Sequence, residues 1–87
     1  MKPRTEQQIQ SAIMVKLRAA GWYVNKLILT THPGIPDLIA HKEGRTMYIE
    51  VKRPGQKPTE LQWHRITELG KYGVKVMVCC DEKELIL

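Results

Sequence analysis

The stretch that decides the fold is Tyr48-Ile49-Glu50-Val51-Lys52-Arg53-Pro54. Its branched and apolar residues favour a β-strand, although a glutamate and a lysine stand within it. Because side chains along a strand alternate between two faces, Glu50 and Lys52 share one face and lie roughly 6 to 7 Å apart along the chain. Ile49 and Val51 take the other face. An acid and a base side by side on a strand of this kind call for an explanation.

Hydrophobic periodicity divides the rest of the chain into helices and strands. Thr5 with Gln8, and Thr59 with Gln62, have the spacing of helix capping boxes, and apolar residues recur at helical intervals after each pair. We expect Leu61, Ile66 and Leu69 on the inner side of the second helix. The sequence predicts a helix over 6–20, strands over 22–29, 37–40 and 46–52, a helix over 60–71, a strand over 74–80 and a short edge strand over 84–87.

The connections between these elements indicate how the strands pair. The short polar loop over 41–45 predicts an antiparallel hairpin between the strands that flank it. The almost continuously apolar run over 74–80 is typical of a strand that is buried on both faces in a parallel pairing. The order α-β-β-β-α-β therefore predicts an α/β fold with a mixed sheet flanked by helices.

Length and charge limit the classes of protein to consider. A chain of 87 residues fits one domain over 1–87, with a single modest core. No apolar run approaches the roughly 20 residues of a membrane span, and the N-terminus lacks a signal-peptide pattern, so we expect a cytoplasmic protein without a membrane partner. The net charge of +5 fits a polyanionic partner, most simply nucleic acid.

The predicted hairpin brings two carboxylates together, because Asp37 opens one strand and Glu50 lies near the end of the next. Two adjacent carboxylates repel each other unless a positive charge lies between them, and a divalent ion such as magnesium or manganese suits oxygen ligands. The carbonyl oxygen of Val51 is a candidate third ligand, and Glu6 is a candidate for a second ion or a bound water. Lys52 is placed to orient water or to stabilise charge on a phosphate.

Each of these residues also has a purely structural interpretation. An E-x-K triplet on a strand is often a solvated ion pair, and an aspartate after a proline is often a turn residue. The combination favours catalysis, because a Gly-x-Pro-Asp run precedes one strand and a Glu-x-Lys triplet follows thirteen residues after its aspartate.

That combination resembles the PD-(D/E)XK nuclease superfamily, through Pro36-Asp37 and Glu50-Val51-Lys52. The chain is similar in particular to the virus-type replication-repair nuclease family, VRR-NUC. The matching motifs are the run from Gly34 to Leu38, the Glu-Val-Lys strand end, and the Thr-x-x-Gln helix start at Thr59. The resemblance implies a restriction-endonuclease-like fold.

The resemblance also implies roles for individual residues and a substrate. Asp37, Glu50 and the carbonyl of Val51 would hold Mg²⁺, with Mn²⁺ able to replace it and no small-molecule cofactor needed. Lys52 would act on the attacking water or the transition state, and Glu6 and Gln62 would complete the site. Stand-alone bacterial and phage members of the family cleave branched DNA, including four-way junctions, as homodimers. Hydrolysis would leave a 5′-phosphate and a 3′-hydroxyl.

Basic residues and a histidine outside this set are candidates for contacts with DNA. We expect phosphate contacts from Arg53 and Lys57, and weigh Lys26 and His32 as further candidates. Arg65, on the second helix, is expected in solvent. Two other functions stay open: a basic nucleic-acid-binding module of the same fold without catalysis, and a homodimeric scaffold whose DNA affinity would not depend on salt.

Overall fold

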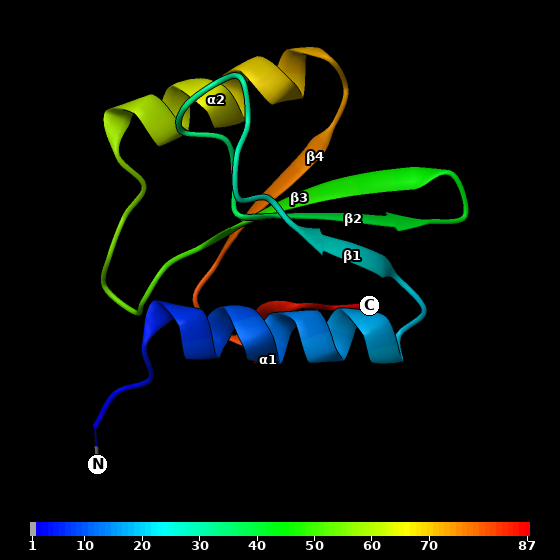
Figure 1. The fold of residues 1–87 in the computed structure, drawn as a ribbon, viewed down its shortest axis with the longest axis vertical. Coiled ribbons are helices and arrows are strands. Elements are labelled where there is room, and N and C mark those ends of the chain that lie inside the picture. The colour runs from blue at the N-terminus through cyan, green and yellow to red at the C-terminus, as the bar shows by residue number, and fades with distance from the viewer. Residues whose placement is uncertain (1) are drawn as a thin grey trace.

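A computed structural model describes residues 2–87 and gives them the predicted α-β-β-β-α-β order (Figure 1). No helix in this range is long and apolar enough to cross a lipid bilayer. The elements are α1 (Glu6–Ala19), β1 (Tyr23–Lys26), β2 (Leu38–Lys42), β3 (Arg45–Val51), α2 (Glu60–Lys71), β4 (Lys75–Cys79) and a short 3-10 helix, η1 (Glu82–Glu84).

The strands form one four-stranded sheet in the order β1-β2-β3-β4. β1, β2 and β3 pair antiparallel, and β4 pairs with β3 in parallel. A parallel pair needs a crossover connection, which α2 provides between β3 and β4. The sheet lies between α1 on one side and α2 on the other (Figure 1), so the predicted mixed sheet flanked by helices is confirmed.

The core lies between α1 and the sheet. Ile9, Ile13 and Leu17 recur at helical spacing and are at most 1% exposed. The helix begins as predicted, because the Thr5 hydroxyl accepts a hydrogen bond from the Gln8 backbone N–H and the Gln8 side chain accepts one from Thr5. The strand residues of the core, from all four strands, are Val24, Leu38, Ala40, Met47, Ile49, Val51 and Cys79.

The second helix has the predicted bounds and the predicted capping box at Thr59, yet none of its residues is fully buried. Ile66 and Leu69 are half-buried as its inner residues. The expected inner position of Leu61 is wrong, since its side chain is 44% exposed. Leu61 lies against Gly34, where an added Cβ would come within 2.8 Å of Leu61 Cγ. The leucine therefore packs on the loop between β1 and β2.

The predicted end of β1 and the predicted bounds of the β2–β3 loop are wrong for reasons of pairing. β2 begins at Leu38 opposite Lys26, so β1 ends there and residues 28 and 29 have no partner strand. The predicted loop over 41–45 shrinks to the pair Glu43 and Gly44, which both have positive φ, +50° and +76°. A two-residue turn of this kind matches the twist of an antiparallel hairpin, so both strands extend into the predicted loop.

The C-terminal predictions are corrected in two respects. β4 is parallel to β3 as expected, but it forms the edge of the sheet, so Val76, Met77 and Val78 are only half-buried. The predicted edge strand over 84–87 is not formed. Glu82–Glu84 form η1 instead, because the Asp81 side chain accepts a hydrogen bond from the Lys83 backbone N–H and caps the turn.

Candidate active site

Two carboxylates meet where β2 begins and β3 ends. Asp37 directly precedes β2, and Leu38 pairs with Ile49, the residue before Glu50. Asp37 Oδ2 accepts a hydrogen bond of 2.8 Å from the backbone N–H of Val51. This bond fixes the Asp37 side chain against the end of β3, next to Glu50. The hairpin thus brings the two predicted acids together.

Glu50 is a buried carboxylate that lacks a hydrogen-bond donor. Its side chain is 1% exposed and lies on the sheet face opposite to that of Ile49 and Val51. Among the described residues, no group donates a hydrogen bond to Oε1 of Glu50. The pKa of Glu50 is raised to about 7, mainly by burial and also by the negative charges of Asp37 and Glu6, while Lys52 acts in the opposite direction. The site therefore has an excess of negative charge that a cation would relieve.

Lys52 supplies part of the missing positive charge. Its Nζ lies 3.7 Å from Glu50 Oε1, which is an ion-pair distance and longer than a hydrogen bond. The Lys52 side chain is 13% exposed, so the ammonium group remains within reach of a ligand at the surface. The backbone N–H of Lys52 donates to Cys79 O at 3.0 Å and holds the residue at the β4 edge of β3.

Glu6 and Gln62 differ in their surroundings near the carboxylates. Glu6, the first residue of α1, is half-buried, and its charge acts on Glu50. Within residues 2–87, no three His, Cys, Asp or Glu side chains converge into a metal cage. Gln62 Oε1 accepts a hydrogen bond of 2.8 Å from the backbone N–H of Thr59, so its carbonyl oxygen serves the helix cap. Roles in catalysis for Glu6 and Gln62 stay predictions.

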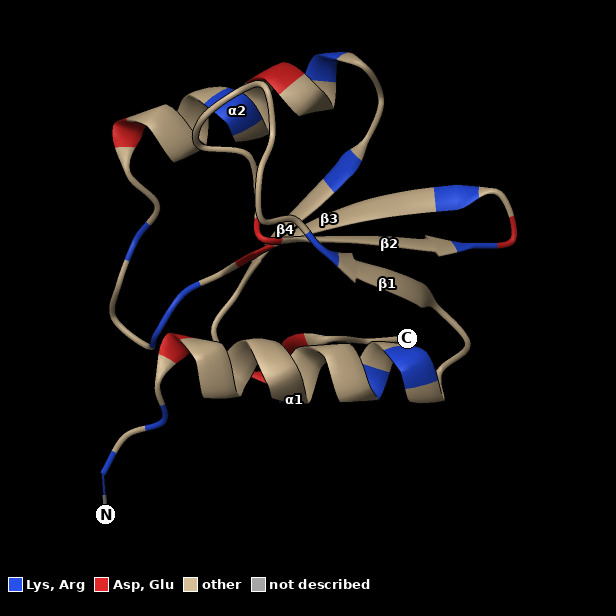
Figure 2. Cartoon of the chain, viewed as in Figure 1, with Lys and Arg blue, Asp and Glu red and all other residues tan. Residues whose placement is uncertain are grey.

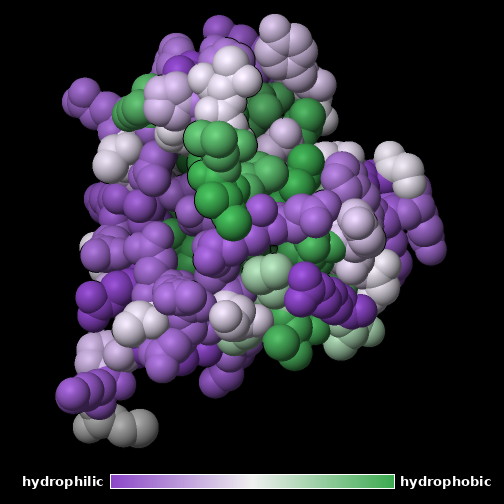
Figure 3. Space-filling view, viewed as in Figure 1, coloured by the Kyte–Doolittle hydropathy of each residue, from purple (hydrophilic) through white to green (hydrophobic). Residues whose placement is uncertain are grey.

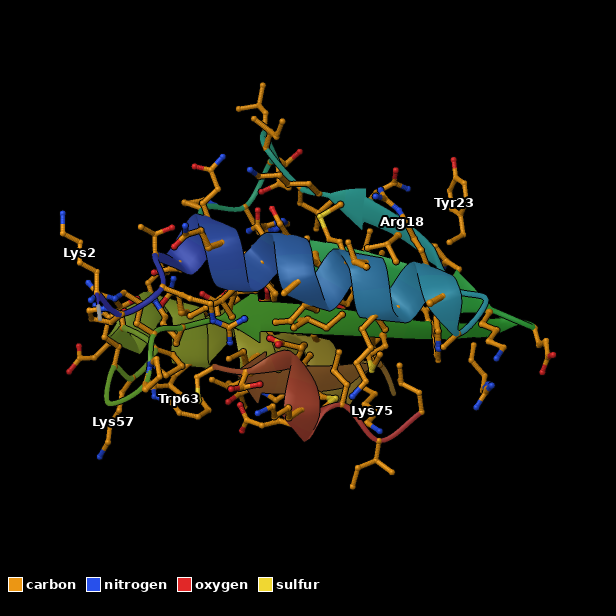
Figure 4. All side chains as sticks on the ribbon, turned by 90° about the horizontal axis from the view of Figure 1, so that it is seen from below. Lys2, Arg18, Tyr23, Lys57, Trp63 and Lys75 are labelled. Carbon is orange, nitrogen blue, oxygen red and sulfur yellow. The ribbon has the colours of Figure 1, made fainter. Side chains whose placement is uncertain are left out.

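The candidate DNA contacts are exposed side chains on the segments that border the carboxylates. Lys26 ends β1, opposite Leu38, and Arg53 follows directly after Lys52. Figure 2 shows this basic segment after β3 running toward the start of α1, and Figure 4 places Lys57 at the same end of the molecule as Trp63. His32 is exposed in the loop between β1 and β2. Their contacts with DNA stay predictions.

Arg65 has a structural role that the sequence did not indicate. Its Nε donates a hydrogen bond of 2.9 Å to Pro33 O, and its side chain is only 14% exposed. The expectation that Arg65 lies in solvent is therefore wrong. The two residues are far apart in sequence, so no local pattern could have revealed the contact.

The carboxylates do not line the cavity found in this structure. A cavity of about 550 Å³ lies at the opposite end of β3, where Trp22, Arg45, Lys75 and Leu87 contribute to its lining. It contains none of the predicted site residues. The carboxylates are instead the candidate site because of the buried Glu50 and its raised pKa, since perturbed ionisable groups gather at functional sites.

Comparisons with known proteins identify the family of this chain. The sequence model of the VRR-NUC domain matches residues 4–80. The chain is 31% identical over 81 residues to a protein of Acyrthosiphon pisum secondary endosymbiont phage 1 named "Putative nuclease p44", covering 92% of this chain and 86% of the phage protein. A solved structure called a VRR_NUC domain superposes with a TM-score of 0.82 at 28% identity, covering 91% of this chain and 87% of that one.

A second solved structure, a VRR_NUC domain protein, shares the fold with a TM-score of 0.79 at 23% identity, and the match covers 94% of this chain and 82% of that one. The family match covers most of the chain, and it includes both carboxylates and Lys52. The chain therefore belongs to the VRR-NUC domain family, a family of nucleases.

Proposed function

We propose that this protein is a divalent-metal-dependent DNA endonuclease that hydrolyses phosphodiester bonds in branched DNA such as four-way junctions. The observation that carries the proposal is the buried Glu50 carboxylate. Its Oε1 is enclosed without a hydrogen-bond donor and lies beside Asp37 and Lys52. A buried acceptor left without a partner destabilises the fold, so its presence here fits a function.

The residues present fit a hard divalent cation. Asp37 and Glu50 offer carboxylate oxygens, and the carbonyl of Val51 offers a third oxygen, a donor set that suits Mg²⁺ and Mn²⁺. When bound, such an ion would polarise a phosphate and lower the pKa of water. The Val51 N–H donates to Asp37 Oδ2 and orients this carboxylate toward the end of β3, which supports Asp37 as a ligand.

The protein's own cations would complete the chemistry. Lys52 lies within 3.7 Å of the buried carboxylate and would stabilise charge that grows on the phosphate. Arg53 and Lys57 are exposed on the following segment and would hold the DNA backbone, with Lys26 and His32 on the other side. Glu6 and Gln62 would position water near the site.

The branched substrate and a homodimer are proposed together. A four-way junction has two strands to cut, related by a two-fold axis, and a C2 dimer presents two identical sites with that relation. A domain of 87 residues offers little surface by itself for gripping several duplex arms.

Cleavage assays on labelled four-way junction, flap and linear duplex DNA test the proposal. With Mg²⁺ or Mn²⁺, we expect paired symmetric cuts in the junction, and none with EDTA. Glu50→Gln should lower the rate by more than the roughly 10- to 100-fold that loss of an outer-sphere partner of a metal ligand causes. The matched control is Glu43→Gln, since Glu43 lies in the exposed β2–β3 turn, 77% exposed.

Two results would contradict parts of the proposal. Cleavage of flap or duplex DNA alone would keep the nuclease and reject the junction. If the wild-type protein and Glu50→Gln both bind DNA and neither cleaves any substrate, the protein is a non-catalytic binding module.

A further inference from the structure

The loop between β1 and β2, residues 27–37, presents two adjacent apolar side chains to solvent. Ile28 is 87% exposed and Leu29 is 93% exposed. Single exposed apolar residues are common on protein surfaces, but a contiguous apolar patch marks a contact surface. Figure 3 shows hydrophobic side chains gathered on the viewed face over this loop.

The loop is held in place at both ends and at its tip. The backbone N–H of Leu27 donates to Asp37 O at 2.8 Å, which joins the two ends of the loop. Thr30 Oγ1 donates to His32 O at 2.7 Å, and Arg65 Nε donates to Pro33 O at 2.9 Å. The two apolar side chains are therefore presented by a fixed support, which limits the entropy lost when they make contact.

The hydrogen bond from the Leu27 N–H to Asp37 O brings the start of this loop next to a residue of the carboxylate site. Leu27 contacts Asp37, and Ile28 follows Leu27 directly. Lys26, on the other side of Leu27, is exposed and positively charged. Figure 2 shows the loop rising from the position of the central acidic residues. A DNA strand that reaches the site would pass the pair, with a cation at hand for its phosphates.

We propose that Ile28 and Leu29 form an apolar wedge that packs on the exposed face of a base at a break in DNA stacking. The inference rests on the proposed function and specifies how the enzyme distinguishes branched from continuous DNA. A continuous duplex offers phosphates and sugars to this surface, and its base faces are covered by stacking. At a branch point the stacking of neighbouring base pairs is readily opened, and apolar side chains placed against a base face freed in this way exclude water.

A second copy of the chain is a poorer occupant of this patch. Stable protein interfaces bury about 800 Å² on each partner, and two side chains provide a small part of that area. An interface centred on Ile28 and Leu29 would also cover the approach to Asp37.

The test compares three variants with the wild-type protein. Ile28→Ser/Leu29→Ser removes the apolar pair, and Ile28→Leu/Leu29→Ile retains it. Val15→Ser is the matched control, because Val15 is an exposed apolar residue on α1, 67% exposed. A junction with 2-aminopurine at the branch point reports base unstacking in EDTA, where no cleavage is expected. Cleavage of junction and linear duplex is then measured with Mg²⁺, and self-association by sedimentation velocity.

We expect wild-type protein to raise the fluorescence and Ile28→Ser/Leu29→Ser to lose most of that rise. The same variant should lower the junction-to-duplex ratio of kcat/KM by about 10-fold, the scale of one lost stacking contact. The other two variants should behave as wild type. An unchanged fluorescence rise and ratio in the serine variant would overturn the wedge, and so would a loss of self-association, which would identify an interface between copies.

The two proposals fail in different ways. Cleavage of the junction without any fluorescence rise would reject the wedge alone. A fluorescence rise that depends on the apolar pair, with no cleavage in Mg²⁺, would reject the nuclease activity and support the wedge.

Discussion

The two sides of the sheet differ in how they are packed. On the α1 side, Ile9, Ile13 and Leu17 are at most 1% exposed against apolar strand residues. On the α2 side, no helix residue is fully buried, and the buried strand residue Glu50 is ionisable. One side has the close packing of a protein core, and the other has a buried acid without a donor.

This difference teaches that a small domain can place its apolar core on one side of a single sheet and its candidate site on the other. The α1 side supplies most of the apolar burial that an 87-residue chain needs. The α2 side can then tolerate an unfavourable group, because the destabilisation from Glu50 is offset elsewhere. Local destabilisation of this kind is common at functional sites.

Truncation of one isoleucine on each side gives the largest expected contrast. Ile13→Ala should lower the free energy of unfolding by about 2 to 5 kcal/mol, because Ile13 is fully buried and leaves a cavity. Ile66→Ala should lower the free energy of unfolding by clearly less, because Ile66 is half-buried and water can fill the space that its side chain leaves. Urea unfolding measures the free energy of unfolding of both variants. Equal decreases for the two variants would show that the two sides are packed alike.

The pH dependence of stability tests the charge on the α2 side. The pKa of Glu50 is raised from 4.5 to about 7 in the folded protein, mainly by burial. The folded state therefore binds the proton more tightly than the unfolded state. In EDTA, the contribution of Glu50 protonation to the free energy of unfolding is fully present below about pH 4.5. It is lost as the pH rises to about 7, a change on the order of a few kcal/mol.

Glu50→Gln is the control for this pH effect, because the amide does not ionise. The pKa values of Glu82 and Glu84 are lowered and give an opposite slope, so the difference between wild type and variant isolates Glu50. We expect Mg²⁺ to restore the wild-type stability near pH 7. The same pH slope in both proteins would refute a raised Glu50 pKa.

The smallest expected effects come from the two capping boxes, which have the same chemistry on opposite sides. Thr5→Ala and Thr59→Ala each remove one cap, and each should cost about 1 kcal/mol. For Thr5 the loss should appear as a lower global stability, because α1 is part of the core. For Thr59 we expect faster hydrogen exchange confined to the first turn of α2. Global destabilisation by both variants to the same extent would contradict this difference.

Local sequence patterns were sufficient for the helices and for the pairing of the two acids. The Thr-x-x-Gln boxes place both helix starts, and the hairpin brings Asp37 next to Glu50. The end of β1 was not predictable in this way, since it depends on where β2 begins, and Ile28 has high strand propensity.

Contacts between distant segments account for the other differences. The Arg65 bond to Pro33 and the packing of Leu61 on Gly34 join a loop to a helix, and neither leaves a periodic pattern. The metal ligands, the DNA contacts and the choice of DNA structure remain predictions, because they depend on partners outside the chain.

The alternation of side chains along β3 makes the core and the candidate site depend on the same strand register. Glu50 lies between Ile49 and Val51, which are both fully buried on the other face. A slip of one residue in the hairpin would turn Glu50 into the core and remove the acid from the site. The Glu43–Gly44 turn fixes the register that satisfies both faces. A misregistered chain would therefore lose stability and the acidic pair of the candidate site together.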